Sequence, residues 1–151
     1  MVGDGNGWVV CSLGHRHWGL FGAAGLLVTD GMRVLLQHRA AWTHEGDSWA
    51  VPGGARDSHE DPIAAALREA TEETSLDPAA VTPISELVDE HGGWRYTTII
   101  ARGAPELAVR PVNGESIAVS WWPLEDVAGL RLHSGFEATW PRLRELAASR
   151  H

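Results

Sequence analysis

The sequence contains no lysine, so all 12 of its fixed basic side chains are arginines. Acidic residues outnumber them at 20, which gives a formal net charge of −8. Proteins that bind nucleic-acid backbones in general are normally basic. We therefore expect no polymeric nucleic acid as a partner. A small anionic substrate remains compatible with this charge, because a bound metal ion reverses the local sign.

Cysteine and long apolar runs are also scarce. Cys11 is the single cysteine, which excludes an internal disulfide framework and suits a reducing compartment. The sequence has no run of 18 apolar residues, and its first residues lack a basic region followed by a hydrophobic stretch. We therefore expect a soluble, cytoplasmic protein with no membrane partner.

The most informative stretch lies between residues 53 and 76. From Pro62 onward it is rich in alanine, leucine, glutamate and arginine, which predicts a helix that starts at a proline. At about 3.6 residues per turn, an apolar stripe able to pack on a sheet consists of Ile63, Leu67, Ala70 and Thr74. The opposite side carries Glu69, Glu72 and Glu73.

Three carboxylates on one helix face repel one another by roughly a few tenths of a kcal/mol per pair. A hard divalent cation such as Mg²⁺ would relieve this repulsion, because it prefers oxygen ligands. The alternative is a solvated acidic surface, which is common for runs of charge. The preceding residues 49–54 (WAVPGG) favour the metal, because a short strand that ends in two glycines lets the backbone approach a ligand closely.

The spacing of these residues is specific. Gly54 is followed after five residues by Glu60, and after seven more by the run Arg68-Glu69-Ala70-Thr71-Glu72-Glu73. This pattern resembles the signature box of the MutT-like Nudix hydrolases. Ser75 stands where that family has a second glycine, and Leu76 fills its aliphatic position. The departure concerns the turn that leaves the helix and no carboxylate.

The resemblance implies a set of site residues. Mg²⁺ or Mn²⁺ would be held by Glu69, Glu72, Glu73 and the carbonyl of Gly53, with Gly54 next to the substrate. Arg68 would orient a carboxylate, and Glu60 would support the loop or an outer metal. The general base stays open between these glutamates and a loop acid.

Two further residues lie outside the box. A further acid is expected at Glu115, with Glu90 and Asp89 as competitors and a solvated glutamate as the alternative. Arg39 is expected to contact substrate phosphate, because a planar guanidinium suits such oxygens. The alternative for Arg39 is a surface arginine that ends a strand.

The implied activity is metal-dependent hydrolysis of the pyrophosphate bond in a nucleoside diphosphate linked to another moiety. The box does not separate nucleoside triphosphates, dinucleotides and nucleotide sugars, nor does it exclude another diphosphate as the small-molecule partner. The alternative function is a degenerate Nudix domain that binds a nucleotide as a regulatory module without turnover. A homodimer is one open assembly state.

The rest of the chain predicts an α/β fold. Strands are expected at residues 18–29, 33–38, 81–89, 94–101 and 115–123, with a helical turn at 124–127 and a helix at 135–148. The last helix should place Phe136, Trp140, Leu143 and Leu146 inward. This order indicates a mixed β-sheet flanked by helices, in agreement with the α/β/α sandwich of the Nudix family. We expect residues 1–151 to form a single domain, with residues 1–16 either partly disordered or adding a short strand near Trp8.

Overall fold

The computed structural model of the protein describes residues 4–43, 45–112 and 116–148. Its strands are β1 (Trp8–Val10), β2 (Arg16–Trp18), β3 (Ala23–Thr29), β4 (Arg33–Arg39), β5 (Trp49–Ala50), β6 (Gly53–Ala55), β7 (Val81–His91), β8 (Trp94–Gly103) and β9 (Ser116–Pro123). Its helices are α1 (Pro62–Thr74), α2 (Ser134–Ala148) and two short 3-10 helices, Pro78–Ala80 and Leu124–Gly129. No helix of the described residues is both long and apolar enough to cross a membrane.

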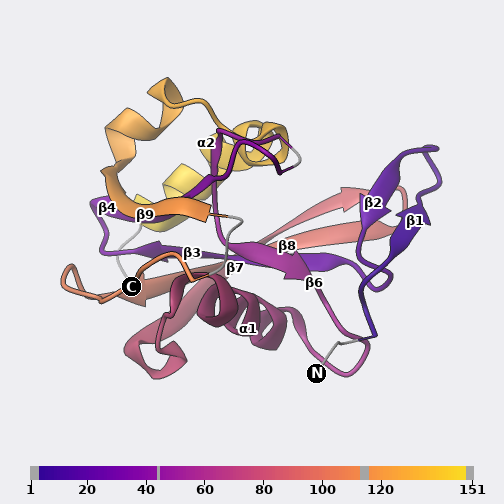
Figure 1. Ribbon diagram of the computed structural model, residues 1–151, viewed down its shortest axis with the longest axis horizontal. Coiled ribbons are helices and arrows are strands. Elements are labelled where there is room, and N and C mark those ends of the chain that lie inside the picture. The colour runs from indigo at the N-terminus through magenta and orange to yellow at the C-terminus, as the bar shows by residue number, and fades with distance from the viewer. Residues whose placement is uncertain (1–3, 44, 113–115, 149–151) are drawn as a thin grey trace.

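The main sheet is mixed, as predicted. Its strands follow the order β5-β4-β3-β8-β7, with β6 also paired to β3 and β9 to β4. Strand β3 runs parallel to β8 and antiparallel to β4 and β6. Helix α1 lies below this sheet and α2 above it (Figure 1), which confirms the predicted sandwich of helix, sheet and helix.

Alternation along β3 explains the two layers. Leu26 and Val28 are fully buried against the α1 side, where they join Ala66 and Ala70. Leu27, which lies between them, points to the other face and packs in the cluster around α2. Because successive side chains of a strand point to opposite faces, an uninterrupted apolar strand is what two helix layers require.

The predicted hairpins are present, but two predicted strands are interrupted. The turn at Asp30-Gly31 joins β3 to β4, and Gly92-Gly93 joins β7 to β8. The apolar stretch at residues 18–29 is not continuous, because Gly19 and Gly22 adopt positive φ and separate β2 from β3. Residues 49–54 likewise form two short strands, β5 and β6, on either side of Pro52.

Helix α2 buries the residues that its sequence pattern predicts. Phe136, Trp140 and Leu143 are buried, and Leu146 packs partly buried against the same cluster. The buried face of α1 is rotated from its prediction. Ile63 is 41% exposed and Leu67 only partly buried, whereas the buried residues of α1 are Ala65, Ala66, Ala70, Glu73 and Thr74. Small alanines allow α1 to lie close to β3, and this rotation turns Glu73 inward.

The first two strands form a separate hairpin that packs against the start of β8. Strand β1 pairs antiparallel with β2, and the pair stands beside the β7–β8 turn (Figure 1). The ring of His17 stacks on Trp94, with centroids 4.3 Å apart and planes 8° apart. His91 and His15 lie 5.5 Å and 6.5 Å from His17 by the same measure. An isolated two-stranded hairpin is marginal in water, so this contact stabilises it.

Docking of this hairpin should depend on pH. Burial, with smaller contributions from His91 and His15, lowers the pKa of His17 below its ordinary value. The docked state therefore binds a proton less readily than the undocked state, so docking should weaken as the pH falls below about 6.5. Hydrogen exchange of the β1 and β2 amides should accelerate, relative to the β3 amides, between about pH 7.5 and about pH 5.5, after correction for the intrinsic rate.

A His17→Phe variant is the matched control, since it keeps a ring on Trp94 and removes the titrating group. It should lose the pH dependence. Equal protection of the wild-type hairpin at both pH values would contradict this explanation.

The end of α1 offers a test of stability. Ser75 caps the helix in a left-handed conformation (φ 59°, ψ 20°), where glycine is favoured. A left-handed non-glycine residue costs roughly 1–2 kcal/mol, partly offset by the lower entropy of its unfolded chain. Ser75→Gly should therefore raise the free energy of unfolding by up to about 1 kcal/mol in urea denaturation. A loss of stability would mean that the serine side chain stabilises the turn.

Candidate active site

The acidic helix is placed precisely relative to the glycine bend. The side chain of Asp61 accepts a hydrogen bond from the N–H of Ala64 at 2.7 Å and caps α1, and Pro62 occupies the first turn. This N-cap fixes where the helix begins and therefore which residues face β6. The cap directly follows the loop of residues 56–60, which connects β6 to α1.

Gly54 is required by the approach of a carboxylate. A Cβ atom on Gly54 would lie 2.6 Å from the carboxyl carbon of Glu69 and 2.7 Å from each of its oxygens. Any side chain at this position would therefore displace Glu69. The Glu69 carboxylate therefore lies in space that is free only because residue 54 is a glycine.

Gly53 is constrained by neighbours on both sides. Its N–H donates to the buried carboxylate of Glu73 at 3.1 Å. A Cβ on Gly53 would lie 2.7 Å from the hydroxyl of Tyr96, and one on Gly25 would lie 2.2 Å from it. Burial, and next the charge of Glu73, raises the pKa of the Tyr96 hydroxyl above its ordinary value. The tyrosine hydroxyl and the glutamate thus converge on the same bend.

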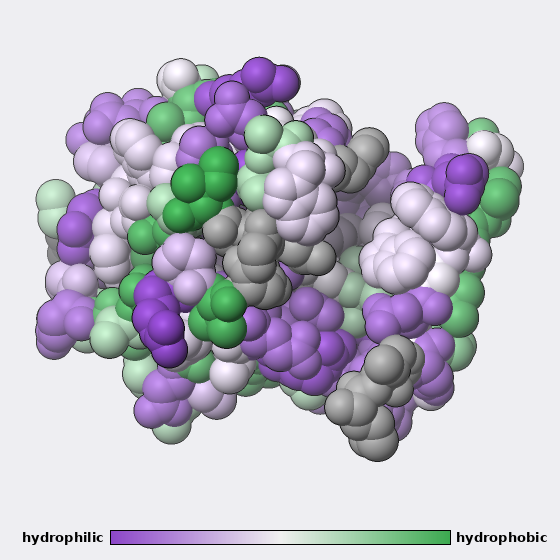
Figure 2. Space-filling model, in the orientation of Figure 1, coloured by the Kyte–Doolittle hydropathy of each residue, from purple (hydrophilic) through white to green (hydrophobic). Residues whose placement is uncertain are grey.

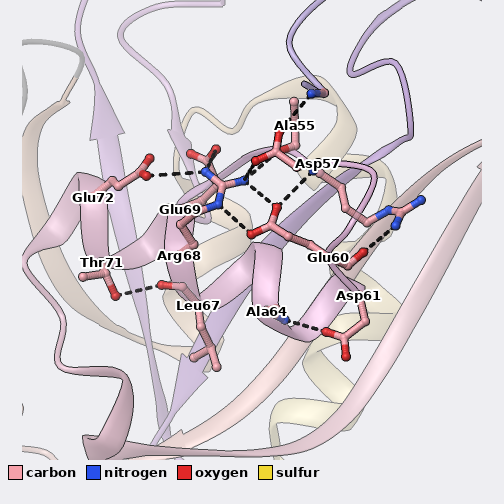
Figure 3. Close-up of polar contacts among 12 residues, drawn as sticks. Ala55, Asp57, Glu60, Asp61, Ala64, Leu67, Arg68, Glu69, Thr71 and Glu72 are labelled. Atoms are coloured by element: carbon pink, nitrogen blue, oxygen red, sulfur yellow. Dashed lines mark hydrogen bonds and ion pairs between the residues drawn. The ribbon is translucent and has the colours of Figure 1, made fainter. Parts of the chain in front are cut away.

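Arg68 ties the loop to the helix (Figure 3). Its guanidinium donates to both carboxylate oxygens of Glu60, at 2.7 Å and 2.8 Å, and to the carbonyl of Ala55 at 3.0 Å. It also pairs with Glu69 at 3.0 Å and reaches Glu72 at 3.5 Å. The Glu60 pair is bidentate, and such pairs fix both distance and orientation. Arg68 therefore holds the Glu60 carboxylate in place and contacts that of Glu69.

The charges of this cluster are unequally solvated. The Glu60 side chain is 8% exposed, and its hydrogen bonds from Arg68 keep its pKa below the ordinary value. The same pair raises the pKa of Arg68. Burial raises the pKa of Glu69, opposed by Arg68 and reinforced by Glu72. Glu72 lies mostly in solvent, with 57% of its side chain exposed.

The donor set fits a divalent cation. Glu69 is a carboxylate whose burial disfavours its charged form, and a cation beside it would reverse that effect. Among the described residues, the three metal-type ligands that converge within 4.8 Å are Asp57, His59 and Glu60 rather than the helix glutamates. Asp57 and Glu60 also contact Arg68, and we call this trio the loop scaffold.

Two predicted site residues, Arg39 and Glu115, lie outside the box. Arg39 is the last residue of β4 and is partly buried, and its part in the site stays a prediction. Glu115 lies outside the described residues. Its competitors in the β7–β8 hairpin are already paired, since Asp89 contacts His91 at 2.9 Å and Glu90 contacts Arg95 at 3.5 Å.

Sequence reasoning missed two residues of the site. Asp57 is 6% exposed and lies 3.6 Å from Arg68, inside the loop scaffold. Its position between Gly54 and Glu60 in the sequence could have indicated that it belongs to the site. The second is Tyr96, whose hydroxyl lies where a side chain on Gly25 or Gly53 would have to be. One ring face of Trp94, which shares the face of Tyr96 on β8, is covered by His17.

A recess separates the β1–β2 hairpin from the half of the molecule that carries α2 (Figure 2). Hydrophilic side chains gather along its lower edge, where α1 lies in Figure 1.

A mixed sheet between two helices, with an Arg-Glu helix packed on a glycine bend, is the arrangement of a Nudix enzyme. Residues 19–145 match the family model described as the NUDIX domain. The chain belongs to the Nudix hydrolase family.

The chain matches several relatives over nearly its whole length. A Mycobacterium tuberculosis protein named "Putative 8-oxo-dGTP diphosphatase 3" is 46% identical over 97% of this chain and 72% of its own length. The crystal structure of the Mycobacterium smegmatis Nudix hydrolase RenU is 47% identical, covers 95% of this chain and 96% of its own, and superposes with a TM-score of 0.88. The Caenorhabditis elegans Ap4A hydrolase, at 23% identity, 83% coverage of this chain, 98% of its own and a TM-score of 0.64, shares the fold.

Substitution of the bend provides a test of the site. Gly54→Ala should lower kcat about tenfold or more, because displacement of a catalytic group by about 1 Å can cost about a hundredfold. Steady-state kinetics with Mg²⁺ would measure this effect. Gly129→Ala is the matched control, since a Cβ there would meet nothing within 4 Å. Equal kcat values for the two variants would show that the position of Glu69 does not affect catalysis.

Proposed function

We propose that this enzyme hydrolyses the pyrophosphate bond of a nucleoside diphosphate linked to another group, and that nucleoside triphosphates with an oxidised purine are its first candidate substrates. The observation that carries this proposal is the contact of Glu69 and Glu73 with the Gly53-Gly54 bend. The substrate class is supported by the name of the 46% identical relative.

The proposed cofactor is Mg²⁺ or Mn²⁺, with Glu69, Glu72, Glu73 and the carbonyl of Gly53 as its ligands. A divalent ion at such a site neutralises phosphate charge and lowers the pKa of a water molecule. Glu73 is suited to this role because the Gly53 N–H orients its carboxylate. Glu72, exposed at the helix edge, is suited to an outer ligand.

The remaining polar residues would act on the substrate and on its neighbours. Arg68 holds Glu69 in one orientation, while Glu60 balances the charge of Arg68. Arg39, at the end of β4, would contact phosphate oxygens of the substrate. Glu115 remains our candidate for the additional acid that binds metal or positions water. The general base is one of these carboxylates.

The setting of this reaction follows from the same chemistry. The lone Cys11 suits a reducing cytoplasm, where nucleotides are available. A small nucleotide is the proposed partner, and light scattering would establish whether the enzyme acts as a homodimer.

The substrate class is tested by Mg²⁺-dependent turnover of oxidised and unmodified purine nucleoside triphosphates, dinucleotide polyphosphates and ADP-sugars. We expect the highest kcat/KM for an oxidised purine triphosphate, with release of a nucleoside monophosphate and pyrophosphate. Preference for a dinucleotide or a sugar would redirect the assignment within the family. Tight nucleotide binding without any turnover would instead favour a regulatory module.

The metal ligands are tested by Glu73→Gln. The amide oxygen can still accept the Gly53 N–H, so the fold should persist while kcat falls about a hundredfold or more, as when a preorganised electrostatic group is removed. Glu125→Gln, an exposed residue of the 3-10 helix, is the control for a lost carboxylate. Wild-type turnover in Glu73→Gln would refute the assignment.

A further inference from the structure

The first described residues are bound to the loop that precedes α1. Asp4 accepts hydrogen bonds from the N–H of Ser58, at 2.8 Å, and from its hydroxyl. The N–H of Gly5 donates to the carboxylate of Asp57 at 2.9 Å, in a buried contact 52 residues apart in the sequence. Figure 1 shows this end of the chain running beside the loop between β6 and α1. We call residues 4–5 the N-terminal strap.

The strap fits tightly against the loop. Gly5 is buried, and a Cβ atom placed on it would lie 2.0 Å from the carbonyl oxygen of Arg56. Backbone atoms cannot yield as the end of a flexible side chain can, so any larger residue would push the strap and the loop apart. On its other side the strap is fixed by the N–H of Leu20, which donates to the Gly5 carbonyl at 2.8 Å.

Asp57 connects the strap to the arginine. One of its oxygens accepts the Gly5 N–H, and the other lies 3.6 Å from the guanidinium of Arg68. The N–H of Asp57 donates to Glu60 at 3.0 Å, and Glu60 binds Arg68 through both oxygens. Arg68 in turn pairs with Glu69 (Figure 3). A series of polar contacts, buried at Gly5 and partly buried at Arg68, therefore runs from residue 5 to a proposed metal ligand.

The strap lies outside the family domain. The match to the family model begins at residue 19, so residues 4–5 belong to a segment that precedes it. The loop and helix α1 belong to the domain. The Gly5 N–H, which donates to the buried Asp57 carboxylate, comes from this earlier segment.

We propose that Asp4 and Gly5 are positioning residues of the active site: they hold residues 56–60 so that Glu60 and Arg68 fix the carboxylate of Glu69 for metal binding. This inference rests on the proposed function for the role of Glu69. Residues 4–5, which lie outside the family domain, would thereby contribute to metal affinity and to kcat.

The test compares Gly5→Ala and Asp4→Ala with Asn6→Ala, an exposed neighbour outside the strap. Kinetics would give kcat, KM for the nucleotide and the Mg²⁺ concentration at half-maximal rate. Loss of groups that orient metal ligands costs about 10–100-fold in affinity or activity. We expect Gly5→Ala to lower kcat and raise the metal midpoint about tenfold, with KM within about twofold because the strap does not contact the substrate site.

Asp4→Ala should act in the same direction to a smaller extent. Asp4→Asn keeps an oxygen acceptor for the Ser58 N–H and should restore most of the loss. Asn6→Ala should match the wild type. A fall in kcat that only follows a lower folded fraction, measured by thermal denaturation, would reduce the strap to a stabilising contact.

Two measurements without substrate keep this inference separate from the proposed function. Mn²⁺ binding, followed by the electron paramagnetic resonance signal of the free ion, should weaken in Gly5→Ala and not in Asn6→Ala. Hydrogen exchange of the amides of residues 56–60 should accelerate in the same variant. If the wild type hydrolyses no nucleotide but both effects appear, the proposed function is wrong and the positioning role of the strap is supported. Unchanged Mn²⁺ binding and unchanged exchange in Gly5→Ala would contradict that positioning role, whatever the substrate is.

Discussion

The bidentate pair between Arg68 and Glu60 is the interaction on which the site depends. Its oxygen and nitrogen atoms lie 2.7–2.8 Å apart, and the Glu60 side chain is 8% exposed. A carboxylate removed from water is stable only when its charge is balanced and its oxygens are hydrogen-bonded. Arg68 satisfies both conditions for Glu60 and still reaches Glu69. One guanidinium thus joins the loop, the bend and the helix into one hydrogen-bonded unit.

The glycines matter because this unit is crowded. Glu69 occupies the space that a side chain on Gly54 would need, and the Tyr96 hydroxyl does the same for Gly25 and Gly53. Neither Gly53 nor Gly54 adopts a positive φ. Their role is therefore close approach rather than backbone freedom. The same explanation applies at Gly5, where the neighbour is the backbone of the loop itself.

Local patterns predicted much of the fold and of the candidate site. The hairpin turns, the apolar face of α2 and the mixed sheet follow from turn chemistry and periodicity, which act over a few residues. The spacing of Gly54, Glu60 and Arg68 indicated the candidate site through its resemblance to the Nudix box. The apolar face of α1 was predicted wrongly, because hydrophobicity favoured Ile63 whereas packing on β3 favoured the alanines. Residues 18–29 looked continuous because two glycines with positive φ have no distinct signal in an apolar run.

The sequence by itself determined the chemistry available to this protein: an acidic helix after a glycine bend, at the spacing of the Nudix box. The tertiary structure decided how each acid is placed. Glu73 is buried against the bend whereas Glu72 is exposed, and Arg68 binds Glu60 through both oxygens but Glu69 through one. It also brought residues 4–5 to a loop more than 50 positions away. Such contacts depend on how the layers pack, and local composition carries no record of that packing.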